Sequence, residues 1–221
     1  CIRDRLQSAI FDMDGTLLDS MPTWRELGPT FLKEAGISAT PEQDRMLHIL
    51  ADCDVIPYLR EICGLPWSQQ EIIDQIIQRM ETFYSSQVRP KPGLEKFLSI
   101  LKMEGVWMYV ATATHRRLTE KALKTAGIDH YFRGIVTSAD AGNHKSESAD
   151  IYEMAMRRLQ SNKRDTVVFE DALHAIRTAK AAGFRVAGVY EATAEQDQPE
   201  IQRLCDYYIR SYEELVQSET F

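Results

Sequence analysis

The chain has 221 residues, of which 44% are hydrophobic, so it can bury a real core as one large domain or as a domain with a smaller insertion. Its formal net charge of -7 argues against a nucleic-acid-binding surface or a basic membrane patch. No apolar stretch approaches the roughly 20 residues that span a bilayer, and the charged start CIRDRLQ lacks the apolar segment of a secretory signal, so we expect a cytoplasmic protein.

The first strand candidate is the apolar run QSAIFD at residues 7–12. From residue 21 to residue 88 no strand candidate follows, and the sequence shows helical spacing instead. We therefore expect an all-helical insertion over residues 21–88. The segment RPKPG at 89–93 would carry the chain back, because prolines stiffen a short connector and Gly93 suits the start of the next helix.

Strand and helix patterns alternate through the rest of the chain. The strand candidates are 106–114, 134–140, 166–171 and 185–190, and the helical patterns between and after them are 94–105, 118–127, 149–160 and 175–183. The tail at 205–217 is expected to add a short edge strand and a last helix. Such alternation is typical of a parallel sheet with helices on its faces. We predict an α/β fold with a Rossmann-like parallel-sheet core, built from residues 1–20 and 89–221 and interrupted by the helical domain at 21–88.

Polar side chains stand where four of the predicted strands end. In open α/β sheets, ligands bind beyond the carboxyl ends of the strands. The residues concerned are Asp12 and Asp14 after the first strand, Thr112 at the end of the second, Lys145 in the loop ADAGNHK after the third, and Glu170 and Asp171 at the end of the fourth. The sequence therefore predicts that carboxylates, a hydroxyl and an ammonium meet in one crevice.

The predicted cluster of carboxylates has consequences for its chemistry. Carboxylates within about 4 to 6 Å repel and raise one another's pKa, so the cluster requires a cation, and oxygen ligands favour Mg²⁺. Such a site suits phosphoryl transfer, in which an aspartate can be the nucleophile. A second carboxyl two residues later can protonate the leaving oxygen and then accept a proton from water. Gly15 lets the backbone turn sharply there, so that loop N–H groups can face a phosphate.

Each of these residues alone has a simpler interpretation. Asp-x-Asp-Gly could form a turn with an Asx hydrogen bond, and Thr112 could cap a helix or stand as an ordinary strand hydroxyl. Lys145 could be a solvated surface lysine, and Glu170 with Asp171 could cap the following helix. Their order and their placement at successive strand ends favour a functional site.

The stretch AIFDMDGTLLDS resembles the first motif of the haloacid dehalogenase superfamily. YVATATHR, the lysine of NHKSESADIY and VVFEDALHAIRTAKAAG are similar to its second, third and fourth motifs, in the same order. The resemblance covers residues 7 to 190, and the helical insertion stands where the phosphoglycolate phosphatase and beta-phosphoglucomutase branch inserts a helical cap. Small departures are Ser-Glu-Ser after Lys145, where many relatives have Pro-x-Pro, Ala113 after Thr112, and Ala175 in place of a frequent glycine.

The resemblance implies a role for each matching position. Asp12 would be the nucleophile and a Mg²⁺ ligand, and Asp14 the general acid/base, with its backbone carbonyl also touching the metal. Thr112 and Lys145 would bind the transferred phosphoryl group. Asp171 would ligate Mg²⁺ directly, with Glu170 as a further ligand or as its neighbouring partner. The implied substrate-contacting residues are Asp12, Asp14, Gly15, Thr112, Ala113, Lys145 and Trp24.

Within the superfamily, Asp14 favours phosphate chemistry, because dehalogenases generally lack this second aspartate. Phosphonate hydrolases use a cap lysine, and the body of this cap offers only Lys33. Sugar phosphomutases carry an early cap histidine at about the position of Trp24 and a basic clamp for a second phosphate. Here LADCDVIPYL contains no Lys or Arg and has Asp52 and Asp54. We therefore expect a monophosphatase and keep a phosphomutase as the alternative.

Two further expectations concern substrate and partners. Trp24, Tyr58 and the nearby acidic residues suit a leaving group that is neutral or positively charged, although the acidic residues could be solvated loop charges. We expect a small phosphate ester as the substrate, no nucleic-acid or membrane partner, and a monomer or weak dimer. A receiver domain is disfavoured because such domains are shorter and place the acidic pair before the acceptor aspartate. A catalytically inactive phosphate-binding protein remains a remoter alternative.

Overall fold

The computed structural model describes residues 6–49 and 52–217. Its centre is a six-stranded, all-parallel sheet with the strand order β3-β2-β1-β4-β5-β6. The strands are β1 (Ser8–Phe11), β2 (Trp107–Thr112), β3 (Ile135–Thr137), β4 (Thr166–Glu170), β5 (Arg185–Val189) and β6 (Tyr207–Ile209). The five predicted strands and the edge strand of the tail are all present, so the predicted parallel-sheet core is confirmed.

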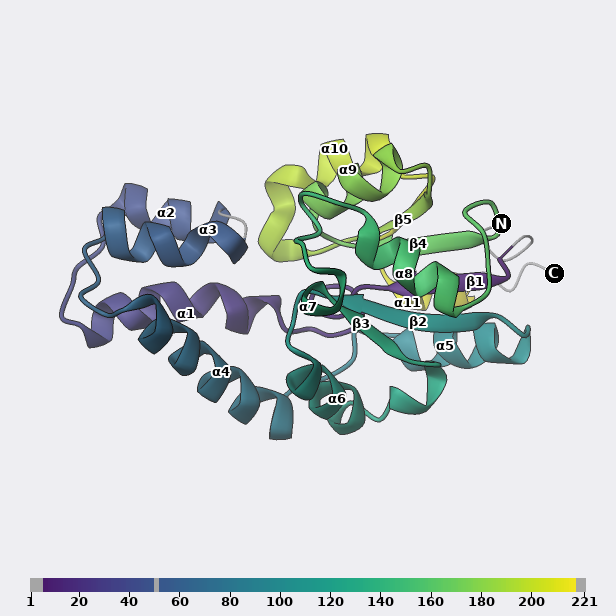
Figure 1. The fold of residues 1–221 in the computed structure, drawn as a ribbon, viewed down its shortest axis with the longest axis horizontal. Helices are drawn as coiled ribbons and strands as arrows, with labels where there is room; N and C mark the ends of the chain where they lie inside the picture. The colour runs from purple at the N-terminus through teal and green to yellow at the C-terminus, as the bar shows by residue number, and fades with distance from the viewer. Residues whose placement is uncertain (1–5, 50–51, 218–221) are drawn as a thin grey trace.

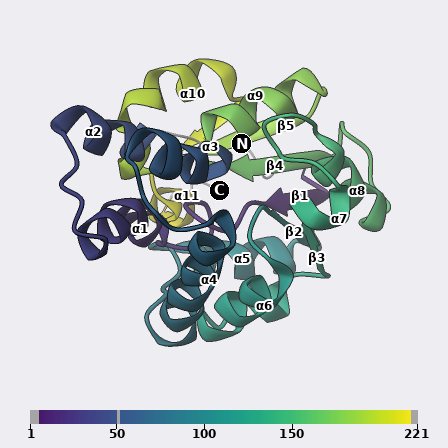
Figure 2. The same cartoon turned by 60° about the vertical axis from the view of Figure 1, so that its left-hand side comes forward.

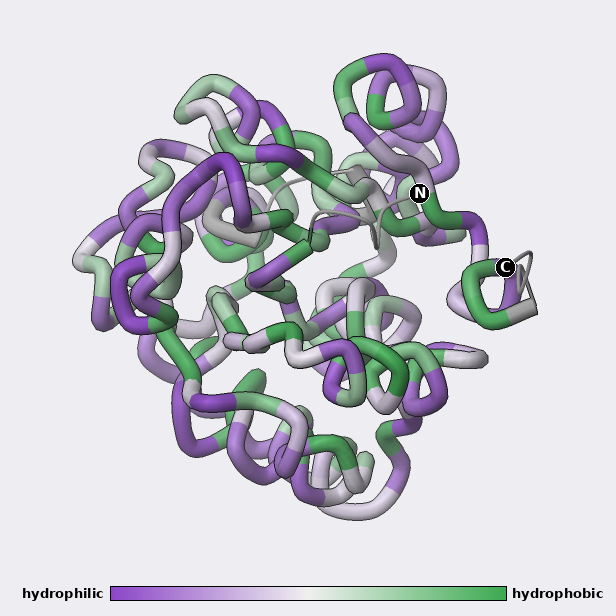
Figure 3. The backbone as a smooth tube through the Cα atoms, turned by 90° about the vertical axis from the view of Figure 1, so that its right-hand side faces the viewer, coloured by the Kyte–Doolittle hydropathy of each residue, from purple (hydrophilic) through white to green (hydrophobic). Residues whose placement is uncertain are grey.

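Helices cover both faces of the sheet because side chains along each strand point alternately to opposite faces. On β1, Ala9 and Phe11 pack on one face, with α5 (Leu94–Met103), α6 (Arg116–Thr125) and α11 (Tyr212–Gln217). Ile10 packs on the other face, with α8 (Asp150–Arg158), α9 (Leu173–Ala181) and α10 (Gln198–Leu204). Figure 3 shows that hydrophobic and hydrophilic residues are interspersed along the chain. The helices on each face contribute buried apolar residues to the core on that face.

The insertion after β1 is helical, as predicted. It comprises α1 (Met21–Glu34), α2 (Pro41–Ile49), α3 (Asp52–Pro57), the π-helix η2 (Tyr58–Ile62) and α4 (Gln69–Ser86). These helices lie to one side of the sheet, and α4 runs alongside the core helix α6 (Figures 1 and 2). The exact domain boundaries at 20/21 and 88/89 stay a prediction.

Three segments differ from the predicted pattern. The loop expected after β3 begins as the short helix α7 (Ser138–Ala141), because the Thr137 side chain and Asp140 cap it reciprocally. The interval 191–204, for which no element was expected, contains the 3-10 helix η4 (Ala192–Asp197) and α10. A further 3-10 turn, η3 (Asp129–Tyr131), precedes β3.

Two properties bear on the expected location of the protein. In the part of the chain that the structure describes, no helix has both the length and the hydropathy needed to cross a membrane. Cys63 and Cys205 are free thiols, while Cys1 and the side chain of Cys53 lie outside the described residues.

Candidate active site

The register of the central strands brings the predicted site residues to one edge of the sheet. Phe11 of β1 lies level with Val110 of β2 and with Phe169 of β4. The next residue, Asp12, donates its backbone N–H to the carbonyl oxygen of Phe169 at 2.9 Å. Parallel strands end at a common edge, so Asp12 is flanked by the end of β2, which is Thr112, and by the end of β4, which is Glu170.

Lys145 lies at the centre of this edge. Its side chain is 6% exposed, and its ammonium group donates to Asp12 Oδ1 and, at 2.7 Å, to Glu170 Oε1. Burial alone would lower the pKa of Lys145, but the charges of Asp12 and Glu170 outweigh it and raise this pKa. Lys145 is therefore a fixed positive charge beside Asp12.

The acceptor positions of the Glu170 carboxylate are filled by hydrogen-bond donors of the protein itself. Its Oε1 accepts from Lys145 and from the Tyr152 hydroxyl at 2.9 Å, and its Oε2 accepts from the backbone N–H groups of Asp171 and Ala172 at 3.0 and 3.1 Å. Burial acts to raise the pKa of Glu170, but Lys145 and these hydrogen bonds lower it. Since a carboxylate has about four acceptor positions, Glu170 is better suited to hold Lys145 than to bind a cation.

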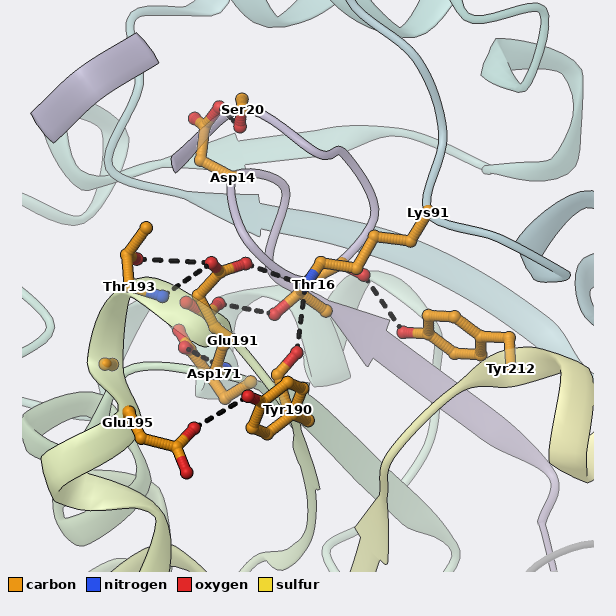
Figure 4. Close-up of polar contacts among 12 residues, drawn as sticks. Asp14, Thr16, Ser20, Lys91, Asp171, Tyr190, Glu191, Thr193, Glu195 and Tyr212 are labelled. Atoms are coloured by element: carbon orange, nitrogen blue, oxygen red, sulfur yellow. Dashed lines mark hydrogen bonds and ion pairs between the residues drawn. The ribbon is translucent and has the colours of Figure 1, made fainter. Parts of the chain in front are cut away.

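Asp171, the next residue, has different surroundings. Its Oδ1 accepts a hydrogen bond from the Thr16 hydroxyl at 2.7 Å, as Figure 4 shows. Its Oδ2 faces Gly15, where a Cβ atom would lie only 2.3 Å away. Burial, and then the charge of Glu170, raise the pKa of Asp171 to about 8. The hydrogen bond from Thr16 and the charge of Lys91 oppose this rise in the pKa of Asp171 only in part.

The carboxylates of Asp12, Glu170 and Asp171 form a buried group whose oxygens all lie within 4.8 Å of one another. Burial and the charges of Glu170 and Asp171 raise the pKa of Asp12, and Lys145 opposes that shift only in part. Three carboxylates thus share one ammonium, and their donor atoms are all oxygens. The residues fit a hard divalent cation, which would be held by Asp12 and Asp171.

Asp14 points toward the helical insertion, away from Asp171 and Thr16 (Figure 4). Its carboxylate accepts hydrogen bonds from the hydroxyls of Ser20 at 2.6 Å, Tyr84 at 2.5 Å and Thr114 at 2.7 Å. Trp24 reaches this group through its indole N–H, which donates to the Tyr84 hydroxyl at 3.0 Å. Although Asp12 and Asp14 are two residues apart, their carboxylates share no hydrogen-bond partner among the described residues.

The remaining predicted residues divide between the site and the surface. Thr112 is buried, and its hydroxyl accepts the backbone N–H of Thr114 at 3.1 Å. The next residue, Ala113, is exposed. Asp54 in α3 is also exposed. Tyr58 lies near Cys63 and Glu42, whose charges contribute after burial to the raised pKa of Tyr58. Asp52 is a further expected cap residue, and its side chain lies outside the described part of the chain.

Several residues of the site were not predicted. They are Thr16, Ser20, Tyr84, Thr114 and Tyr152. All of them except Tyr84 stand within quoted motifs, where their hydroxyls were a usable signal. The two tyrosines sit in amphipathic helices, in which a buried tyrosine gives the same pattern as an ordinary core residue.

Comparisons with known proteins identify the family that this chain resembles. A family model described as haloacid dehalogenase-like hydrolase matches residues 9–189. The chain is 26% identical to a phosphorylated carbohydrates phosphatase of Thermotoga maritima, over 83% of this chain and 85% of that protein. It is also 26% identical to hexitol phosphatase B of Escherichia coli K12, over 96% and 95% of the two chains.

A solved structure shows the same fold. CbbY from Rhodobacter sphaeroides, in complex with xylulose-(1,5)bisphosphate, superposes with a TM-score of 0.79 at 22% identity. The superposition covers 95% of this chain and 96% of that one. The arrangement of sheet and helical insertion is therefore shared with this protein.

Proposed function

Because this chain belongs to the haloacid dehalogenase-like hydrolases, we propose that it is a Mg²⁺-dependent phosphatase that hydrolyses a small-molecule phosphate monoester through an aspartyl-phosphate intermediate. One observation carries the proposal. The Asp12 carboxylate is buried at the end of β1, is held by Lys145, and lies within 4.8 Å of two further carboxylates, so the group has more negative charge than the protein neutralises.

In the proposed reaction, a carboxylate oxygen of Asp12 attacks phosphorus and the bond from phosphorus to the ester oxygen breaks. Asp14 gives its proton to the departing oxygen. A water molecule then attacks the aspartyl phosphate and gives a proton back to Asp14, and the bond between Asp12 and phosphorus breaks to release inorganic phosphate. Thr112 and Lys145 bind the phosphoryl oxygens throughout, and loop N–H groups after Gly15 face them.

Mg²⁺ would be held by carboxylate oxygens of Asp12 and Asp171, and by the backbone carbonyl of Asp14 as the family resemblance implies. When bound, it supplies positive charge that neutralises phosphoryl oxygens and favours the ionised form of both carboxylates. Glu170 acts next to this pair by holding Lys145 against Asp12. Thr16 orients Asp171 through its 2.7 Å hydrogen bond.

Release of phosphate from p-nitrophenyl phosphate tests the proposal. We expect turnover that requires Mg²⁺, is lost in EDTA, and falls by about 10³-fold or more in Asp12→Asn, because an amide cannot form the intermediate. Phosphate trapped on the wild-type protein should be released by hydroxylamine, which cleaves acyl phosphates. The proposal is overturned if Asp12→Asn keeps the turnover of the wild type. It is also overturned if the correctly folded wild-type protein shows no turnover, which is what a catalytically inactive phosphate-binding protein would give.

We propose a phosphorylated sugar or sugar alcohol as the substrate class. The names of the two phosphatases similar to this chain support it, and so does the expectation of a neutral leaving group. A Mg²⁺-dependent panel of phosphate esters tests it. Sugar and polyol monophosphates should give the highest kcat/KM, and a clear preference for dicarboxylate or bisphosphate esters would contradict it.

A sugar phosphomutase remains the alternative. Against it, Trp24 occupies the position expected for the mutase histidine, and its indole nitrogen is engaged by Tyr84. The phosphatase proposal fails if phosphosugar isomerisation exceeds phosphate release when a bisphosphate activator is present. A cytoplasmic location and a monomeric or weakly dimeric state stay predictions of the sequence.

A further inference from the structure

Tyr84 is a buried residue of α4 that none of the sequence motifs contains. Its side chain is fully buried, yet its hydroxyl lies 2.5 Å from Asp14 Oδ1, to which it donates. The same hydroxyl accepts from Trp24 Nε1 at 3.0 Å. The Tyr84 hydroxyl therefore accepts from Trp24 and donates to Asp14, so its proton points at Asp14.

The three hydroxyls that bind Asp14 come from different parts of the molecule. Ser20 precedes α1 in the linker, and Thr114 lies in the core between β2 and α6. Tyr84 is the contribution of the last helix of the insertion. Because Tyr84 lies in α4, its contact makes the position of the Asp14 carboxylate depend on how α4 packs against the core.

The seating of α4 is itself fixed by contacts with the core. Glu81, one turn before Tyr84, accepts hydrogen bonds from Arg117 at 2.7 Å and from Lys121 at 3.2 Å, both on α6. Residues three apart in a helix lie on one face, so the face that docks on α6 is also the face that carries Tyr84. Thr114 stands just before α6, which explains why the two hydroxyls meet at one carboxylate.

We propose that Tyr84, oriented by Trp24, is a positioning residue for Asp14, and that it places this carboxyl for proton transfer to the leaving oxygen when α4 is docked on the core. The inference rests on the proposed phosphatase reaction and deepens it.

The dependence of the rate on the leaving group tests this role. Phenyl phosphate needs an acid more than p-nitrophenyl phosphate does, because phenolate is the poorer leaving group. We expect Tyr84→Phe to lower kcat about tenfold on phenyl phosphate, and clearly less on p-nitrophenyl phosphate. Trp24→Phe should also lower kcat more on phenyl phosphate than on p-nitrophenyl phosphate, but by a smaller factor. This variant can test the role of the pair if Tyr84→Phe does not fold.

Tyr131→Phe is the matched control. It removes a hydroxyl that is hydrogen-bonded to Ser99 at 2.6 Å in the core, so both rates should stay near wild type. A double-mutant cycle adds a readout that a purely structural role would not give. Tyr84→Phe should add little to the loss caused by Asp14→Asn on phenyl phosphate, since the tyrosine acts through that carboxyl.

Two results would overturn the inference. One is an equal loss on both substrates in Tyr84→Phe, and the other is full additivity with Asp14→Asn. Failure of the phosphatase proposal looks different, because Asp12→Asn would then retain turnover. The role of Tyr84 alone is wrong under the following combination of results. Asp12→Asn is inactive, and the loss of kcat in Asp14→Asn depends on the leaving group, but the loss in Tyr84→Phe does not.

Discussion

Asp12 and Asp14 stand two residues apart but receive opposite kinds of hydrogen-bond donor. Asp12 is held by the ammonium of Lys145, whereas the donors to Asp14 within the described part of the chain are the neutral hydroxyls of Ser20, Tyr84 and Thr114. A cation beside Asp12 favours the ionised form that a nucleophile requires. The neutral donors add no positive charge beside Asp14, which suits the acid/base task proposed for this carboxyl.

Asp14→Asn is expected to separate these two tasks. It should lower turnover of phenyl phosphate by about 10²-fold or more and turnover of p-nitrophenyl phosphate much less, because the better leaving group departs without a proton. Asp12→Asn should abolish both. Steady-state kcat on the two esters measures the difference, and equal losses in Asp14→Asn would leave it without an acid role.

Gly15→Ala is expected to damage the cation site. Gly15 has a φ of 81°, and an added Cβ would lie 2.3 Å from Asp171 Oδ2. We expect the Mg²⁺ concentration for half-maximal turnover to rise about tenfold, because Asp171 must move. Left-handed backbone strain alone should cost about 1–2 kcal/mol of stability.

Gly36→Ala is the matched control for that change. Gly36 also has a positive φ, of 71°, but its Cβ would meet nothing within 4 Å. It should therefore show the cost of backbone strain without any change in the Mg²⁺ requirement. A similar Mg²⁺ requirement in both variants would show that the contact with Asp171 is not what matters.

The two linkers that join the helical insertion to the core form a short antiparallel ribbon. The backbone N–H of Asp19 donates to Arg89 at 3.0 Å, and that of Lys91 donates to Leu17 at 2.9 Å. The Lys91 ammonium then reaches across to Glu191 at 2.7 Å, after β5 (Figure 4). The side chains of Lys91 and Glu191 are only 14% and 4% exposed, so the ion pair ties the return linker to the core in a largely dry environment.

Breaking this pair should destabilise the protein strongly. Lys91→Met leaves the Glu191 carboxylate buried without its cation, which should lower the free energy of unfolding by about 3–5 kcal/mol. Lys91→Met combined with Glu191→Gln should recover part of that loss. Urea unfolding measures the free energy of unfolding of the wild type and of each variant.

Arg177→Met provides the comparison on the surface. Arg177 pairs with Glu200 at 2.8 Å, but their side chains are 55% and 37% exposed, so its loss should cost at most about 1 kcal/mol. If Lys91→Met proves as mild as Arg177→Met, the buried pair does not hold the linker.

The excess of buried negative charge affects the stability of the whole molecule. The pKa of Asp171 is raised to about 8, whereas aspartate in an unfolded chain titrates near about 3.9. Between these values the folded protein keeps a proton that the unfolded chain has lost, so its stability falls as the pH rises. The raised pKa of Asp12 acts in the same direction.

In EDTA, the free energy of unfolding should therefore fall between about pH 6 and pH 8, by about 1 kcal/mol per pH unit from Asp171. Saturating Mg²⁺ should reduce the fall, because a cation bound to the folded state favours the ionised carboxylates. Urea unfolding at several pH values, with EDTA or Mg²⁺, measures both effects. Asp171→Asn should weaken the pH dependence in EDTA, and a stability that stays level or rises over this range would contradict the charge balance described above.

The strand ends and the helical insertion could be predicted because they depend on local pattern. The apolar runs that precede Asp12 and Glu170 form β1 and β4, and the strandless interval from 21 to 88 forms helices. Parallel strands share one carboxyl edge, so the order of polar residues along the chain already indicates which of them meet. The segment at 191–204 was not predicted, because its helices are short and irregular, with non-helical backbone at Ala194.

Tertiary structure alone assigned the partners within the site. Glu170 and Asp171 are adjacent and chemically alike, yet one is filled by four donors and the other meets Thr16 and Gly15. Tyr84 meets Asp14 across 70 residues, and Lys91 meets Glu191 across 100. The sequence by itself determined the sheet, the insertion and the chemical groups at the strand ends, because periodicity and strand termini are local properties. Which oxygen meets which donor was decided by strand register and by the docking of α4 on α6, since those distances arise only when segments far apart in the chain pack together.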